Sequence, residues 1–316
     1  MLLALQLCGR DGQAKALPAI LYNNIVPVFI AIGLGYTLER TLKMEIKSVS
    51  RTIFYALSPC LIFSSLVQST VSKGEFWRIA SFGILITLGV ALVAWGATKA
   101  LRFDRAMESA FLLATLFVNA GNYGLSVNLF AFGETTLARA VMYFAVSSLL
   151  INTTGIYLAS RGKATAFDAL LNGFKVPIVY AVFLAIFVNL MNLNVTGSPL
   201  FEAVEMVGKG AVPLMLLLLG MQLAKTPVAQ GMRIVGLAAF IRLAVAPAIA
   251  LLPADWLNLA GSTLQACVVE ASMPTAVTTT VLAIEFDVKP EFVTSVVFLS
   301  TLASPITLTP IIALVS

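Results

Sequence analysis

NAGNYG (residues 119–124) and ASMPTA (residues 271–276) interrupt two segments that are otherwise apolar over the length of a membrane span. Glycine, proline and small polar residues are grouped there, and a proline removes a backbone donor and clashes with the preceding helical turn. Unwound backbone at membrane depth is tolerated only where it lines a cavity or is buried in protein. We therefore expect two broken membrane helices that cross one another and gather their polar groups into one site.

The composition is that of a membrane protein. Of 316 residues, 59% are hydrophobic and 11% are charged, whereas soluble globular chains carry about 25% charged residues. The net charge of +5 comes from scattered basic residues, so no nucleic-acid partner is expected. The chain has no histidine, which excludes histidine metal sites and Ser-His-Asp triads, and its three cysteines lack metal-ligand spacing. We expect neither an enzyme nor a bound cofactor.

Charged residues mark the limits of ten segments that are long and apolar enough to cross a bilayer. The eighth segment contains Arg242 and the ninth contains Glu270, and the seventh has charges only near its start. The sequence therefore predicts an all-α integral membrane protein with ten transmembrane helices. The predicted spans are 16–38, 52–72, 79–98, 109–133, 140–160, 176–201, 201–224, 234–254, 256–284 and 292–316.

Lysine and arginine are distributed unequally between the loops. Most of the twenty lie in loops that follow spans 1, 3, 5, 7 and 9. Because cytoplasmic loops of membrane proteins carry the excess of basic residues, this distribution predicts that both termini are non-cytoplasmic. The predicted location is the cytoplasmic (inner) membrane, crossed several times, with the lipid bilayer as a partner.

Similar motifs recur about 150 residues apart, which indicates an internal repeat. Pro27 of span 1 corresponds to Pro177 of span 6, Pro59 of span 2 corresponds to Pro213 of span 7, and the interruptions correspond in spans 4 and 9. Each half has an odd number of spans, so the second copy would insert upside down. The alternative is that prolines and glycines are simply frequent in membrane helices. The expected parts are a first five-helix repeat over 1–160, a cytoplasmic linker over 161–175 and a second five-helix repeat over 176–316.

The broken helices offer two kinds of binding group. A half-helix that begins at an interruption presents unpaired N–H groups, which suit a carboxylate, and one that ends there presents carbonyl groups, which suit a cation. Polar side chains flank both interruptions: Asn119, Asn122, Ser126 and Asn128 in the first, and Ser272, Thr275, Thr278, Thr279 and Thr280 in the second.

Three stretches resemble the auxin efflux carrier family and its bacterial permease relatives: GNYGLSVNLFAFGE (121–134), INTTGIYLAS (151–160) and the segment from MPTAVTTT to SPITLTPII (273–312). The resemblance covers essentially the whole chain. It implies ten helices in two inverted repeats, crossing broken helices 4 and 9, and extracellular termini. It also implies a scaffold of helices 1, 2, 6 and 7 and a moving transport domain of helices 3–5 and 8–10. The family's substrates are organic anions, indole-acetate in plants and malonate, malate and similar acids in bacteria.

Residue by residue, the resemblance implies a substrate site at the two interruptions. Asn119 matches the asparagine that opens the helix 4 motif. Gly121, Asn122 and Gly124 match its glycine-rich break, and Pro274 matches the crossover region of helix 9.

Two positions depart from the family pattern. Ser126 stands where the family has proline, and Thr278 stands where bacterial relatives often have asparagine. A serine restores the backbone N–H that proline lacks, so either the break is partly healed or the hydroxyl contacts the substrate. The expected substrate-binding residues are Asn119, Gly121, Asn122, Gly124, Ser126, Arg242, Ser272, Pro274, Thr275 and Thr278.

Glu270 and Arg242 are the ionisable residues deep within spans, where such groups are costly and are functional candidates. We expect Glu270, four residues before Pro274, to be the coupling site, which either takes up a proton or holds Na⁺. The distantly similar bile acid:sodium symporter fold has an acidic residue in a comparable position. The alternative is a structural ion pair with Arg242, whose guanidinium could instead meet a substrate carboxylate.

The sequence therefore predicts a secondary carrier of a small organic anion, such as a mono- or dicarboxylate or an auxin-like weak acid. It would work by elevator-type alternating access, and a homodimer through the scaffold helices would suit it. The alternatives are a sodium-coupled, bile-acid-like symporter of amphipathic anions, an ion channel and an intramembrane enzyme. The inverted repeat argues against a channel built from several subunits, and an enzyme would lack a catalytic dyad.

Overall fold

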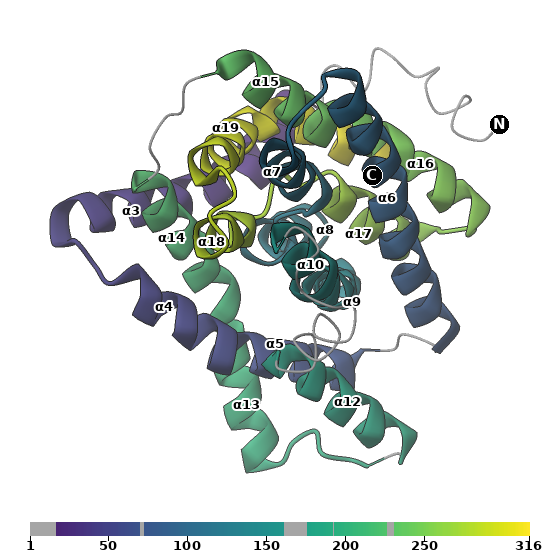
Figure 1. Ribbon diagram of the computed structural model, residues 1–316. Coiled ribbons are helices and arrows are strands. Elements are labelled where there is room, and N and C mark those ends of the chain that lie inside the picture. Colours follow the sequence, from purple (N-terminus) through teal and green to yellow (C-terminus); the bar gives the residue numbers. More distant parts are fainter. Residues whose placement is uncertain (1–16, 70–72, 161–175, 192, 226–230) are drawn as a thin grey trace.

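The computed structural model describes residues 17–69, 73–160, 176–191, 193–225 and 231–316 (Figure 1). Over these residues the chain is helical, with one isolated antiparallel bridge, which confirms the all-α class; the predicted linker 161–175 lies outside them. The elements are η1 (Leu21–Ile25), α3 (Val26–Leu42), α4 (Ile46–Thr52), η2 (Ile53–Leu57), α5 (Ser58–Gln68), α6 (Lys73–Ala100), α7 (Arg105–Leu116), η3 (Ala120–Gly124), α8 (Leu125–Phe132), α9 (Glu134–Leu150), η4 (Ile151–Gly155), α10 (Ile156–Ala159), α12 (Pro177–Leu190), α13 (Pro199–Lys209), α14 (Ala211–Ala224), α15 (Met232–Phe240), η5 (Ile241–Val245), α16 (Ala246–Trp256), α17 (Gly261–Ala271), α18 (Thr278–Glu285) and α19 (Pro290–Val315).

Within the described part of the chain, seven continuous helices are long and apolar enough to cross a membrane. They are Leu17–Leu42, Ile46–Gln68, Gly74–Ala100, Glu134–Ala159, Pro199–Ala224, Met232–Trp256 and Pro290–Val315. A shorter apolar helix, α12, lies over the sixth predicted span. The fourth predicted span instead consists of two short helices, α7 and the helix formed by η3 and α8. The ninth predicted span likewise consists of α17 and α18.

Proline explains three of the π-helical turns. The turns η1, η2 and η5 each end two residues before a proline, namely Pro27, Pro59 and Pro247. Because proline has no N–H and its ring clashes with the carbonyl four residues earlier, the preceding turn opens to the wider i→i+5 pattern. The turn η3 ends in the same register before Ser126. The wide turn therefore persists where serine supplies the N–H that the family's proline lacks.

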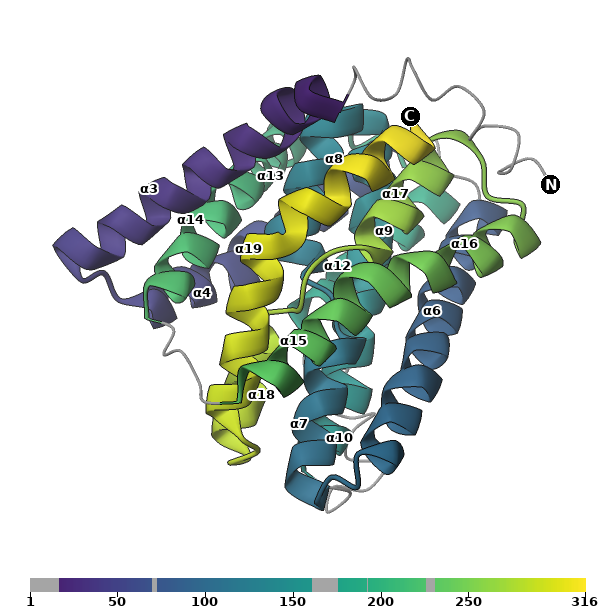
Figure 2. The same ribbon diagram turned by 90° about the horizontal axis from the view of Figure 1, so that it is seen from above.

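The helices form two groups, each built from two separate parts of the sequence (Figure 1, Figure 2). In the first group, α3 packs on α14, and α5 packs on α12 and α13. In the second group, α9 packs on α17, α6 on α16 and α15 on α19. The groups meet where α14 contacts η3 and where α5 contacts α9. The two interrupted spans both lie in the second group, at its contact with the first.

Two glycines set the close approach of α3 and α14. A Cβ added to Gly220 would lie 2.7 Å from the backbone nitrogen of Tyr36, and one added to Gly35 would lie 2.8 Å from the Cα of Leu217. Small residues allow helix backbones to approach closely in membranes, where dispersion contacts drive packing. The first group is therefore held together at positions where a side chain does not fit.

Candidate functional site

The two interrupted spans cross and pair through their backbones. Short non-helical segments follow α7 and α17, and they form the antiparallel bridge between Val118 and Thr275. The N–H of Asn119 donates to Pro274 O at 2.8 Å, and the N–H of Ala276 donates to Phe117 O at 2.9 Å. Each unwound segment thus satisfies backbone groups of the other, which allows irregular structure at membrane depth.

The first interruption lies slightly earlier than predicted. Residues 120–124 form the π-helix η3, and the non-helical residues are 117–119. The expected break over 119–124 is therefore wrong in position, because glycine-rich residues can still close a wide helical turn once their neighbours are packed. The second interruption covers residues 272–277, close to the predicted 271–276.

Two predicted substrate residues, Pro274 and Thr275, bond across the crossing, and a third, Ser272, bonds to its own helix. The hydroxyl of Thr275 donates to Ala114 O at 2.6 Å, and the hydroxyl of Ser272 donates to Val268 O at 2.6 Å. Pro274 supplies the carbonyl that accepts from Asn119. Ser272 and Thr275 are fully buried. The hydroxyl of Thr275 bonds across to the first span, whereas the hydroxyl of Ser272 bonds back to its own helix, α17.

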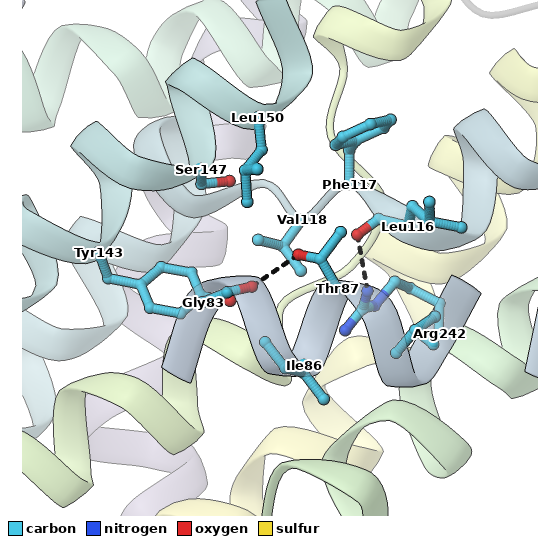
Figure 3. A pocket seen from close by; sticks show the side chains of 11 residues that line it. Gly83, Ile86, Thr87, Leu116, Phe117, Val118, Tyr143, Ser147, Leu150 and Arg242 are labelled. Carbon is cyan, nitrogen blue, oxygen red and sulfur yellow. Dashed lines mark hydrogen bonds between the residues drawn. The ribbon is translucent and has the colours of Figure 1, made fainter. Parts of the chain in front are cut away.

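Arg242, in η5, lies at the C-terminal ends of α7 and α17, which are the first half-helices of the two interrupted spans. One terminal nitrogen donates to Thr115 O at 2.9 Å and to Leu116 O at 3.4 Å, and the other donates to Ala271 O. Figure 3 shows the guanidinium beside Leu116. Both residues line a cavity of about 10 Å³, which is close to the room that one water needs. Among the described residues, Arg242 forms no ion pair, so the predicted alternative of a pair with Glu270 is wrong.

Glu270, near the end of α17, is fully buried against the opposite span. Its Oε1 accepts from Asn128 Nδ2 at 3.0 Å, and its Oε2 has no hydrogen-bond partner among the described residues. A Cβ added to Gly124 would lie 2.6 Å from the Glu270 carboxyl carbon. The predicted substrate residue Gly124 therefore makes room for this carboxyl group. Ser126 is also buried, and its hydroxyl has no partner among the described residues.

A cavity of about 490 Å³ lies beside the crossing, between the two groups of helices. Four predicted site residues line it: Asn119, Gly121, Asn122 and Thr278. Gly121 also lets an aromatic ring approach, since a Cβ there would lie 2.7 Å from the ring of Phe144. The polar lining further includes Ser50, Ser58, Ser147, Ser148, Asn152, Gln222 and Glu285.

Two helix N-termini face this cavity, one from each interrupted span. Residues 120–132 form a continuous helix that begins at Ala120, and α18 begins at Thr278; both residues line the cavity. The amide Nδ2 of Asn119 is buried, without a hydrogen-bond partner among the described residues. Unpaired N–H groups and the positive end of the helix dipole favour an anion at such ends. At α18 the N–H groups of Thr279 and Thr280 already donate to Ala276 O and Val277 O, so the dipole is the main contribution there. The cavity lining contains no lysine or arginine among the residues that the structure describes.

Residues 20–312 match the family described as membrane transport protein (Mem_trans). The chain belongs to this family. The match confirms the resemblance to the auxin efflux carrier family that the motifs at 121–134 and 273–312 indicate. As a member of a family of membrane transport proteins with several apolar helices, the chain is an integral membrane protein and a transporter.

Two archaeal relatives of this membrane transport protein are similar over most of their length. An uncharacterized transporter of Methanothermobacter thermautotrophicus is 26% identical over 294 residues, which cover 90% of this chain and 95% of the relative. An uncharacterized transporter of Methanocaldococcus jannaschii is 25% identical over 284 residues, which cover 88% of this chain and 92% of the relative.

Polar residues on α9 and η4 that are not among the expected substrate-binding residues also line the cavity of this transporter. Ser148 and Asn152 are four residues apart on one helical face, and Asn152 Nδ2 donates to Ser148 O at 2.8 Å. Such a pairing is common in membrane helices, where small polar residues bond to their own backbone. The sequence signal for these residues is the polar spacing that runs from Ser147 into the family motif at 151–160.

Proposed function

We propose that the protein is a secondary active transporter of small organic anions. The observation that carries the proposal is the 490 Å³ cavity at which two helices begin and whose lining includes Asn119, a residue with a buried and unpartnered amide Nδ2. A carboxylate there would accept from backbone N–H groups and from Asn119 Nδ2 without needing a basic side chain. This fits a lining in which, among the described residues, Glu285 alone is charged.

Ten membrane spans in two inverted repeats are the architecture that best suits this proposal. Within the described residues eight apolar helices are continuous, and the two interrupted spans would supply the other two. The repeats would comprise 1–160 and 176–316, so that helices 4 and 9 occupy matching positions. The packing supports this division, because each group of helices draws on both halves of the sequence.

Elevator-type movement is the mechanism that we propose for this carrier. The cavity is lined by Ser58 and Met215 of the first group and by Asn119 and Thr278 of the second. The first group would be the scaffold, and the second, which contains the crossing, would slide against it with the bound anion. Gln222 and Glu285 of the lining are near loops predicted to be cytoplasmic, which favours an inward-facing state.

The size of the cavity suits a mono- or dicarboxylate such as malonate or malate, or an auxin-like weak acid. A neighbouring cavity of about 400 Å³ shares Gln222, Val277 and Val281 with the first and is lined mainly by apolar side chains. That neighbour favours an amphipathic anion as the second candidate. Competition separates the two: malonate and a long-chain amphipathic carboxylate are each added to counterflow of a labelled acid, and the stronger inhibitor identifies the class.

Uptake of a labelled dicarboxylate into proteoliposomes tests the function. We expect saturable uptake with counterflow, and a rise in KM of roughly tenfold or more for Asn119→Ala, because a hydrogen bond to a charged group is lost. Asn119→Asp, which places a negative charge at the same point, is expected to abolish saturable uptake. Asn194→Ala, at an exposed loop residue, serves as the matched control. Uptake that stays linear in concentration would exclude a carrier, and an unchanged KM in Asn119→Ala would exclude this site.

A further inference from the structure

A single side chain joins the ends of two half-helices that are far apart in the sequence. Arg242 donates to the carbonyls of Thr115 and Leu116, the last residues of α7, and to the carbonyl of Ala271, the last residue of α17. The side chain is buried, with 1% of its surface exposed. Its contacts therefore lie wholly inside the crossing.

The carbonyls at these two ends need a positive partner. The last carbonyls of a helix have no N–H partner within the helix, and together they carry the negative end of its dipole, equivalent to about −0.5 charge. Two such ends meeting at one point add up to about −1, which one guanidinium balances. Because the hydrocarbon core offers no water and the cavity beside Arg242 has room for about one, most of the donors must come from a side chain or from a bound cation.

The other roles considered for Arg242 do not fit its surroundings. Among the described residues it has no carboxylate within ion-pair distance, and its Nε has no hydrogen-bond partner. It does not line the 490 Å³ cavity. That cavity is instead lined by Ala120 and Thr278, where the second half-helices begin. Val118 and Ser147 line both that cavity and the small cavity beside Arg242, so they stand between the guanidinium and the larger space.

We propose that Arg242 is a tethered cation that fills a carbonyl site at the crossing, in the place where a diffusible cation would otherwise be bound. Arg242 is then a positioning residue. It holds the ends of α7 and α17 in place, so that the second half-helices, 120–132 and α18, keep their N-termini at the cavity. The native protein needs no Na⁺ at this point. Shortening the side chain creates a site for a small monovalent cation, for which a free guanidinium ion is the best match.

Thermal unfolding of purified Arg242→Ala in detergent tests this proposal without any transport assay. In choline chloride the thermal midpoint is expected to fall by roughly 10 °C, because buried carbonyls lose their partner. Guanidinium chloride at equal, low ionic strength is expected to restore at least half of the loss in a saturable manner, and NaCl less. The native protein and Gly220→Ala, which is destabilised elsewhere by steric overlap, are expected to gain nothing from guanidinium.

Two longer substitutions keep the test decisive if Arg242→Ala does not fold. Arg242→Lys retains the charge and Arg242→Met retains the length alone, so we expect the lysine variant to have the higher thermal midpoint or to be the one that folds. A methionine variant as stable as the lysine variant would overturn the proposal, as would failure of the lysine variant to fold, or an Arg242→Ala protein that ignores guanidinium. If native protein showed no saturable anion uptake, the proposed function would fail while these thermal results still decided the role of Arg242.

Discussion

Replacement of Gly220 with alanine is expected to lower the thermal midpoint of the purified protein by roughly 4–8 °C. The added Cβ would overlap Ile32 O and lie 2.7 Å from Tyr36 N, and both are backbone atoms of α3 that cannot rotate away. Overpacking of this kind costs about 1–3 kcal/mol, and more where backbone must move. The helix propensity of alanine offsets about 1 kcal/mol of that cost. Thermal unfolding in detergent measures the result.

Gly33, on the same helix α3, provides the matched control. A Cβ at Gly33 meets nothing within 4 Å, so Gly33→Ala is expected to change the midpoint by no more than about 2 °C. Gly35→Ala is expected to behave like Gly220→Ala, since its Cβ would lie 2.7 Å from the carbonyl carbon of Leu217. The double variant at Gly35 and Gly220 is expected to lower the thermal midpoint by less than the sum of the two single losses, because both substitutions push α3 and α14 apart. Equal losses at Gly33 and Gly220 would contradict this account.

Glu270→Gln is expected to separate transport from its driving ion. The glutamine oxygen can still accept from Asn128 Nδ2, so the buried packing is preserved, but an amide neither takes up a proton nor neutralises Na⁺. We expect uptake driven by a proton or sodium gradient to fall by roughly tenfold or more, while exchange of labelled substrate without a gradient persists. Both quantities are measured in proteoliposomes, with each gradient imposed in turn.

Glu108→Gln is the control for this variant. Glu108 forms an ion pair with Lys99 (N···O 2.9 Å) at a partly exposed position away from the crossing, so its loss is expected to leave the gradient response unchanged. A Glu270→Gln protein that responds to both gradients as the native protein does would remove Glu270 from the coupling mechanism. The gradient that ceases to act in the variant identifies the ion.

Local chemistry made the two interruptions predictable. Proline and clustered glycines weaken a helix whatever surrounds them, so their positions in spans 4 and 9 are visible in the sequence. The exact register is not visible in the sequence, because it depends on a distant partner: Asn119, just before η3, donates its N–H to Pro274 O. Ser126 likewise does not predict the π-helical turn η3 that precedes it, because serine, unlike proline, has a backbone N–H.

The partners of polar side chains were harder to predict than their presence. Glu270 and Arg242 were recognised as unusual, and an ion pair between them was a natural alternative, yet Arg242 binds backbone carbonyls instead. Every residue has a carbonyl, so a sequence carries no mark of which one an arginine will meet. For the same reason, Thr275 was expected to contact substrate, although its hydroxyl donates to Ala114 O.

The pairing of the two interrupted spans has a consequence for biosynthesis. Asn119 leaves the ribosome well before Pro274, whose carbonyl accepts its N–H in the finished protein. At about 5–20 residues per second, the delay is roughly 10–30 seconds. Throughout that interval the first interruption has no backbone partner from the second, and hydrocarbon cannot supply one. We therefore expect the first interrupted span to stay in contact with water or with the insertion machinery until the second interrupted span has been made.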